Sequence, residues 1–492
     1  MIRALAFLLA LAAAPLQAAE PKLLLMPTDS PLVTLRLVFR TGAAFDPEGK
    51  EGAAALTAAM LSRGGSAELP YDQIVEKLFP LAASVNAQVD KETVVFHGTT
   101  HVDNLEAYYE TLRSMLLEPG WREDDFRRLK DEALNFLRIE LRSNNEEELG
   151  KEFLYLQIYP DAHPYGHHNV GTIESLEALT LDDLKAFYQE NFRRGNLTIG
   201  LAGGYPGGFA ETVAQDFMAL ADGAPPAPEL PASEPVQGLR VHLVQKETRS
   251  TLISLGFPLE VTRAHPDWPA LKLVQSYFGQ HRSSKSYLYQ RIREIRGLNY
   301  GDYAYIEYFP SGMYQFRPDP NRARRQQIFQ IWIRPVQPQN GPFTLKIALY
   351  ELDKLVRDGL SEEDLESTRL FLSKYVNLLT QTQEEQLGYA LDSEFYGVGP
   401  FNSWFKERLQ GLTLEEVNSA IRRHLRPSNL DVVVITADAA GFQRALESSR
   451  LPSLEYASPP PQAILEEDKL IARYKLDVGD IGVTPAEQIF ED

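Results

Sequence analysis

Apolar and polar residues follow one another along the chain in patterns that predict both strands and helices. Thr93–Thr100 alternates with the period of two that is typical of a strand. Asn104–Leu117 and Glu123–Ser143 carry apolar residues at helical spacing, and Ser66–Phe79 is expected to be helical after an initial turn. Strands and helices mixed in this way predict an α+β fold, in which each sheet is covered by helices on one side.

Two segments of the first half recur in the second half in the same register. Leu179–Leu184 (LTLDDL) matches Leu412–Val417 (LTLEEV), and in both a Thr precedes an acid by three residues, the capping box that starts a helix. Asn191–Leu197 matches His424–Leu430, and each is followed by a strand-like run. In both matches the second-half segment follows its first-half counterpart by the same number of residues. We infer the duplication of one domain, and we expect two homologous domains, each a mostly antiparallel sheet covered by helices.

Changes in composition predict where the domains begin and end. Residues 222–237 are rich in proline, alanine, glutamate and serine, which is typical of an extended linker. A second proline cluster, Pro459–Pro461, precedes the end of the chain. The expected division is a signal peptide at 1–19, an N-terminal domain at 20–221, the linker at 222–237, a C-terminal domain at 238–457 and a tail at 458–492.

The first residues predict export from the cytoplasm. Arg3, a short apolar run from Ala4 to Pro15 and the small residues Ala18 and Ala19 are typical of a secretory signal peptide. The apolar run is shorter than the roughly 20 residues of a membrane helix, so we expect no stable membrane insertion, although a retained N-terminal anchor is an alternative. The expected compartment is the bacterial periplasm.

Composition also excludes several kinds of site. The chain has no cysteine, which excludes a disulfide framework and a zinc site made of thiolates. Its 49 basic residues are outnumbered by 68 acidic ones, for a net charge of −19. Because phosphate binding needs a basic face, nucleic acid is not an expected partner.

Several motifs, in order along the two halves, resemble one family. Glu51–Leu61 followed by Arg63-Gly64-Gly65, Val85–Ala87 before a strand, and His163–Gly166 before a glycine turn are similar to segments of the pitrilysin/insulinase/mitochondrial processing peptidase family of inverzincin metallopeptidases. Leu288–Tyr300 is similar to the family's C-terminal signature. The resemblance covers nearly the whole mature chain. It implies two homologous domains that form half of a clamshell chamber.

The chain departs from the family at the zinc site. Active members carry His-x-x-Glu-His on the first helix, where two histidines one turn apart hold zinc and the glutamate activates water. Ala55, Ala58 and Ala59 stand at the corresponding positions. The resemblance places the third ligand near Leu137 or Arg138, and neither is a metal ligand. We therefore expect no metal and no cofactor in this chain.

The other histidines and the glycine-rich run that could suggest a metal or phosphate site are better explained by ordinary structural roles. None of the nine histidines belongs to an intact zinc motif. His97 and His101 lie on a predicted strand, where four residues span roughly 13 Å. Gly203–Gly208 lacks the spacing of a phosphate loop or a dinucleotide fingerprint and is expected to be a turn. Three histidines in a Pro/Gly segment favour a polar loop over a metal site: His163, His167 and His168.

Arg293 and Tyr300 have two interpretations. From the pattern alone, Arg293 is a solvated helix charge and Tyr300 begins an aromatic strand. The resemblance implies instead that the pair reaches across the chamber to the peptide bond held at zinc. A guanidinium and a phenol O–H can polarise the scissile carbonyl and stabilise the oxyanion.

We therefore expect a non-catalytic subunit of a heterodimeric zinc metallopeptidase. A homologous partner would supply zinc, its ligands and the base, and this chain would supply Arg293, Tyr300 and the chamber wall. The substrates would be peptides or unfolded segments, held extended along a sheet edge such as the one after Asn86.

Two other interpretations remain open. The chain could be a peptide-binding or scaffolding protein with no proteolytic role, which would keep the chamber but have no need of the Arg/Tyr pair. It could also be an active peptidase with an unrecognised site, which would require a metal-ligand set that the sequence does not offer.

Overall fold

Two sheets organise the chain, one in each half. The computed structural model describes residues 19–233, 235–448, 451, 454, 456 and 460–492, so almost all of the expected signal peptide lies outside the described residues. The five-stranded N-terminal sheet has the order β1-β5-β2-β4-β3, with β1 Lys22–Pro27, β2 Leu32–Phe39, β3 Asn86–Val89, β4 Val94–His101 and β5 Leu197–Gly203. The six-stranded C-terminal sheet has the order β11-β6-β10-β7-β9-β8, with β6 Leu239–Gln245, β7 Thr251–Leu259, β8 Asn299–Tyr305, β9 Gln327–Val336, β10 Leu430–Thr436 and β11 Val478–Pro485.

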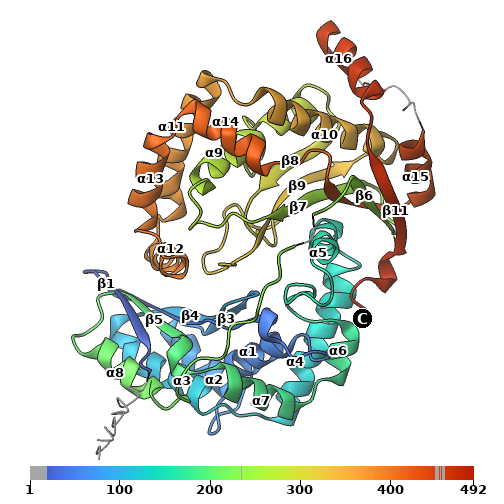
Figure 1. Cartoon of the computed structure of the whole chain (residues 1–492). Helices are drawn as coiled ribbons and strands as arrows, with labels where there is room; N and C mark the ends of the chain where they lie inside the picture. Colours follow the sequence, from blue (N-terminus) through green and yellow to red (C-terminus); the bar gives the residue numbers. More distant parts are fainter. Residues whose placement is uncertain (1–18, 234, 449–450, 452–453, 455, 457–459) are drawn as a thin grey trace, which may run out of the picture.

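Helices pack on both sheets (Figure 1). The N-terminal half contains α1 Ala53–Arg63, α2 Tyr71–Leu78, α3 Leu105–Leu117, α4 Glu123–Asn135, the π-helical turn η4 Phe136–Leu141, α5 Glu146–Ile158, α6 Ile173–Ala178, α7 Leu181–Asn191 and α8 Phe209–Phe217. The C-terminal half contains α9 Trp268–Gly279, the π-helical turn η6 Tyr289–Glu294, α10 Gly341–Asp358, α11 Glu362–Leu379, α12 Gln383–Tyr396, α13 Phe401–Gly411, α14 Leu414–His424, α15 Ala439–Glu447 and α16 Gln462–Arg473. None of the described helices has the length and apolar character to cross a membrane.

The expected α+β fold with two mostly antiparallel sheets is confirmed. The strand order β1-β5-β2-β4-β3 is repeated as β6-β10-β7-β9-β8, and β11 is added at the outer edge of the second sheet. In each sheet the first strand runs parallel to its neighbour and the remaining pairs of the repeated order are antiparallel. The interior strands β5 and β10 are buried along their whole length, which explains why apolar residues predominate in both.

The repeated capping boxes start equivalent helices. The side chain of Thr180 accepts a hydrogen bond from the backbone N–H of Asp183, and Thr413 does the same for Glu416. In both boxes the acid returns a bond to the backbone N–H of the Thr, at 2.8 Å in each case. These bonds satisfy N–H groups that a helix start leaves without partners.

The two halves cover each other's sheets, which the sequence did not predict. Helix α5 of the first half packs against β7 and β10 of the second sheet, and α12 of the second half packs against β1, β2 and β5 of the first (Figure 1). Each sheet is therefore covered on its second face by a helix from the other half. The exchange makes the two halves one packed unit.

Buried polar contacts reinforce this packing. The guanidinium of Arg324, in the segment between β8 and β9, donates to the Asp90 carboxylate of the first half, with Nε 3.1 Å from each oxygen. Both side chains are almost completely buried. Nearby, Nε2 of Gln88 on β3 donates to the carbonyl of Asn321 at 3.0 Å. Because a buried charge is stable only when paired, these contacts depend on both halves being in place.

The expected linker and tail run between the two halves. The described residues within 222–237 form no helix or strand, and Arg325 donates to the carbonyl of Pro228 at 3.0 Å. After β11 the chain crosses back to the first half, where Phe490 is 3% exposed within the N-terminal core. The carbonyl of Phe490 accepts from the N–H of Ile173 at 2.8 Å, at the start of α6. The end of the chain therefore completes the N-terminal core.

Candidate functional site

Helix α1 carries the positions where the family resemblance places zinc ligands. The helix starts after Gly52, whose φ of 96° is left-handed, and a Cβ there would lie 2.3 Å from the carbonyl oxygen of Val170. The Asp46 carboxylate accepts from the N–H groups of Gly52 and Ala54, each at 2.7 Å. Alanine is the strongest helix former, so an alanine-rich segment held in this way forms a regular helix.

Ala55, Ala58 and Ala59 line a cavity of about 650 Å³. The cavity is bounded by α1, by α2 with the segment after it, and by the edge strand β3. Its described lining is mostly apolar and contains no His, Asp, Glu or Cys. A zinc ion needs nitrogen, sulfur or carboxylate ligands, so the residues around this cavity do not fit one.

Neither Leu137 nor Arg138, near which the third ligand was expected, offers a metal-binding atom. Leu137 is completely buried in the N-terminal core, and the guanidinium of Arg138 is 2.6 Å from Glu177. The closest acid along α4, Glu132, forms an ion pair with Arg63 at 2.5 Å. The positively charged partner lowers the pKa of Glu132 although partial burial opposes it, so this carboxylate is ionised and already paired.

Arg293 and Tyr300 lie together at the edge of the C-terminal sheet. Arg293 is on η6, and the chain then turns at Gly297, whose φ of 65° is left-handed, before Tyr300 enters the edge strand β8. The Arg293 Nη1 donates to the carbonyl of Tyr300 at 2.6 Å. Its guanidinium carbon is 4.5 Å from the centre of the Tyr300 ring and 4.8 Å from that of Tyr289.

This arrangement orients a cation and leaves a phenol accessible. Arg293 lies against two aromatic rings, which restrict the orientation of its guanidinium. A guanidinium has five N–H donors, so the bond to Tyr300 leaves others available. Tyr300 is 60% exposed. The structure thus brings together the two residues that the sequence singled out, at an accessible sheet edge.

The loop histidines have structural partners. His163 Nε2 lies 3.0 Å from Gln326, and its Nδ1 accepts from the N–H of Tyr165 at 2.9 Å. His167 lies 3.2 Å from Asp46, the acid at the start of α1. Burial, with the nearby charge of Lys91 as a smaller cause, lowers the pKa of His168 to about 3, so this ring is neutral. These contacts favour the polar-loop interpretation.

The strand histidines are paired with acids in different places. His97 Nδ1 lies 3.2 Å from Glu384, on α12 of the second half, while His101 lies 3.3 Å from Asp103. Both are on β4, as the alternation predicts. The two histidine rings therefore make separate contacts.

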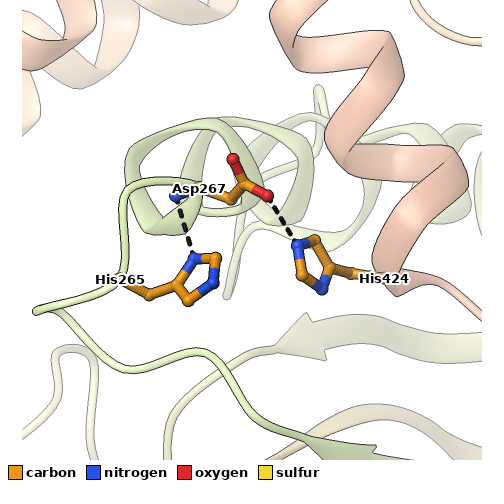
Figure 2. Close-up of side chains that lie close together, drawn as sticks. All are labelled: His265, Asp267 and His424. Atoms are coloured by element: carbon orange, nitrogen blue, oxygen red, sulfur yellow. Dashed lines mark hydrogen bonds and ion pairs between the residues drawn. The ribbon is translucent and has the colours of Figure 1, made fainter.

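One group of potential metal ligands was missed by the sequence analysis. His265, Asp267 and His424 offer ligand atoms that lie within 4.8 Å of one another, and no other such group occurs in the part of the chain that the structure describes. Figure 2 shows the three side chains converging from the start of α9 and the end of α14. The close pair His265-x-Asp267 was visible in the sequence, but its distant third member was not.

Comparison with known proteins identifies relatives in peptidase family M16. The insulinase domain of peptidase family M16 matches residues 24–161, and the peptidase M16 inactive domain matches residues 178–372. A non-peptidase homolog, YmxG of Helicobacter pylori, is 21% identical over 414 residues, which cover 82% of this chain and 89% of the relative. An uncharacterized zinc protease, YmxG of Bacillus subtilis, is 24% identical over 300 residues, covering 60% of this chain and 67% of the relative.

Solved structures share the fold. A peptidase M16 inactive domain from Pseudomonas fluorescens has a TM-score of 0.74 at 24% identity, covering 85% of this chain and 97% of that one. The first half of the periplasmic protease PqqL from Escherichia coli has a TM-score of 0.64 at 15% identity, covering 93% of this chain and 96% of that one. In the longer PqqL structure the match covers 49% of the chain, with a TM-score of 0.66 at 16% identity. The present chain thus shares the fold of about one half of PqqL.

Proposed function

Because the chain belongs to the M16 peptidase family and has alanines at the zinc-ligand positions, we propose that it is the non-catalytic subunit of a zinc metallopeptidase. A homologous subunit supplies the zinc ion, its ligands and the base. This chain supplies Arg293, Tyr300 and the facing wall of the chamber. The two-half architecture of PqqL supports the pairing, because one half of that protein has the fold of this entire chain.

The observation that carries this proposal is the geometry of Arg293 and Tyr300. A side chain kept only for packing would be buried, but the Tyr300 ring is mostly exposed and lies at a sheet edge. Arg293 is held by two rings and a backbone carbonyl, and it forms no ion pair among the described salt bridges. A positive charge and a phenol O–H fixed at one edge are suited to stabilising an oxyanion presented by another subunit.

The substrates are peptides or unfolded segments in an extended conformation. Strands β3 and β8 each form an edge of their sheet, with one side not paired to a described strand. An extended peptide can add to such an edge through backbone hydrogen bonds. Recognition of this kind depends on the substrate backbone and requires little of the substrate sequence.

A peptide-binding protein without a proteolytic role is the second candidate. The observation that favours it is the apolar cavity beside β3, with the rim residue Phe79 83% exposed. A cavity of this kind can hold an apolar side chain while the peptide backbone pairs with the strand. This candidate has no use for the oriented Arg293, which is why we place it second.

The test is complementation with the zinc-bearing homologue from the same genome. Each subunit alone is expected to be nearly inactive on a quenched fluorescent peptide, and the mixture is expected to cleave it. Arg293→Ala and Tyr300→Phe in this chain are each expected to lower turnover about 100- to 1000-fold, the usual cost of losing one oxyanion donor. Tyr300→Phe keeps the ring against Arg293, so it tests the hydroxyl alone.

Two substitutions serve as matched controls. Tyr314→Phe removes a hydroxyl from another exposed tyrosine, and Arg357→Ala removes an exposed arginine that is paired with Asp358. Both should leave turnover unchanged, and all variants should form the same dimer by size-exclusion chromatography. Full activity in a complex carrying both Arg293→Ala and Tyr300→Phe would refute the assigned roles and favour the scaffold.

Export to the periplasm is part of the same proposal. It rests on the charged and apolar pattern of the first 19 residues. N-terminal sequencing of the protein recovered from the periplasmic fraction is expected to begin at Ala19 or Glu20. A soluble exported protein that still begins at Met1 would contradict cleavage.

A further inference from the structure

The group His265, Asp267 and His424 lies where two helices of the C-terminal half meet. Asp267 is the residue that precedes α9, His265 lies two positions earlier, and His424 is the last residue of α14. Helices α9 and α14 pack against each other. The two imidazole rings are 5.4 Å apart and nearly perpendicular. All three side chains are partly buried, so their positions are restrained but remain reachable from solvent.

Hydrogen bonds already orient the three side chains. His424 Nε2 lies 2.7 Å from Oδ2 of Asp267, and His265 Nδ1 accepts from the backbone N–H of Asp267 at 3.0 Å (Figure 2). Ligands at 2.0–2.1 Å from a tetrahedral zinc are roughly 3.3 Å from each other. The present spacing, at most 4.8 Å, is therefore within side-chain adjustment of a coordination sphere.

We propose that His265, Asp267 and His424 bind a divalent transition-metal ion of the zinc class and that the ion joins the start of α9 to the end of α14. Two imidazoles and one carboxylate suit zinc, nickel or copper, whereas magnesium and calcium prefer oxygen ligands alone. Three protein ligands leave a fourth position for water. The site belongs to the C-terminal half and is separate from the alanine-lined cavity, so it does not depend on the proposed function.

Metal binding would change the hydrogen bonds that the three residues now make. Binding requires the proton of His424 to leave Nε2 and His265 to give up or rearrange its bond to the N–H of Asp267. Arg423, which is also paired with Asp267, is 57% exposed and can move into solvent when the ion arrives.

The experiment titrates zinc chloride into the tag-free, full-length exported chain after treatment with a chelator. Isothermal titration calorimetry is expected to show one zinc ion per chain, and the melting temperature is expected to rise with zinc but not with magnesium. His265→Ala and His424→Ala should each weaken binding at least about 10-fold. His101→Ala, which removes an exposed histidine paired only with Asp103 among its described contacts, is the matched control and should change nothing.

Arg423→Ala gives a test that does not depend on damaging the site. Removing the competing cation should strengthen zinc binding, because Asp267 no longer has to release Arg423. The alternative is that the three residues form only a hydrogen-bonded brace between the helices. Failure of the wild-type chain to bind zinc would establish that alternative. Zinc binding that persists unchanged in both His265→Ala and His424→Ala would equally overturn the proposal.

Discussion

Strands β3 and β8 hold the same place in the repeated strand order, at one edge of each sheet, but the chemistry beside them differs. Next to β3, helix α1 presents the methyl groups of Ala55, Ala58 and Ala59 to an apolar cavity. At the start of β8, Tyr300 and Arg293 present a phenol and an oriented cation. The duplicated scaffold is the same at both edges, so function here depends on a few side chains that the scaffold does not require.

The loss of ligands at α1 leaves the helix intact for a physical reason. Alanine favours helix more than histidine or glutamate does, and Ala58 is completely buried without any polar group that needs a partner. The fold around α1 is therefore expected to be as stable without zinc ligands as with them. At β8, in contrast, the exposed Tyr300 adds little to packing, so stability alone does not account for its presence.

The two edges belong to different halves of the chain, and the largest loss of stability is expected when a buried contact between these halves is removed. Asp90→Ala leaves Arg324 buried without its partner, and the free energy of unfolding is expected to fall by about 3–5 kcal/mol. Urea unfolding of the wild-type and variant chains at pH 7 measures this difference. Asp124→Ala, which removes an exposed acid from a surface ion pair, is the control and should cost less than about 1 kcal/mol.

The same pair predicts a pH dependence. Burial alone would raise the pKa of Asp90, but the Arg324 guanidinium and its hydrogen bonds outweigh it, so the pKa lies below the ordinary value. A depressed carboxyl pKa stabilises the fold above the unfolded-state value of about 3.9 and loses that effect as the pH falls through the folded-state value. The difference between wild type and Asp90→Ala should therefore persist from pH 7 to pH 5 and shrink below about pH 4. A difference that grows with acid would show that Asp90 is not stabilised as an anion.

The contributions of the two edges to peptide cleavage can be distinguished by filling the cavity at β3. Ala55→Trp places an indole in a cavity of about 650 Å³ without touching Arg293 or Tyr300. In the mixed complex this variant is expected to cleave peptide at the wild-type rate, whereas Arg293→Ala lowers the rate. Binding of a fluorescent peptide to this chain alone would be measured in parallel by anisotropy. A large loss of turnover in Ala55→Trp, with the dimer intact, would show that the substrate occupies the β3 edge of this chain during cleavage.

The smallest change in the free energy of unfolding is expected when either of the repeated capping boxes is removed. Thr180→Ala and Thr413→Ala each remove one side-chain bond at a helix start and should lower the free energy of unfolding by about 1 kcal/mol. Because the two boxes have the same geometry, the two losses should be similar. Thr212→Ala, at a threonine of α8 whose hydroxyl donates to the carbonyl of Gly208, the residue before the helix, is the control and should cost less. Unequal losses from the two boxes would indicate that the duplicated helices no longer contribute equally to stability.

Local features were predictable from the sequence because their causes are local. Thr180 and Thr413 start helices through bonds to residues three positions away, and the capping pattern identified both. Thr93–Thr100 forms β4 with a shift of one residue at each end. The absence of ligands at Ala55, Ala58 and Ala59 needed no structure, since a methyl group offers no lone pair to a metal.

The helical pattern over Glu123–Ser143 was only partly informative. The helix α4 ends at Asn135 and continues as the π-helical turn η4. Apolar spacing does not distinguish an α-helix from a short π-helical turn, because both place side chains on similar faces. The family resemblance indicated the sheet edge after Asn86, which is β3, but the strand β1 was not predicted, since it depends on pairing with β5 far along the chain.

What the sequence determined by itself was the duplicated α+β architecture, the helix starts and the alanines at the zinc-ligand positions; through the family resemblance it also singled out Arg293 and Tyr300 as candidates. Only the tertiary structure decided that α5 and α12 cover the opposite sheets, that Tyr289 and Tyr300 flank Arg293, and that His424 meets His265 and Asp267. The reason is sequence separation. Capping and periodicity act over a few residues, whereas contacts between distant segments arise only when the apolar faces of whole elements pack together.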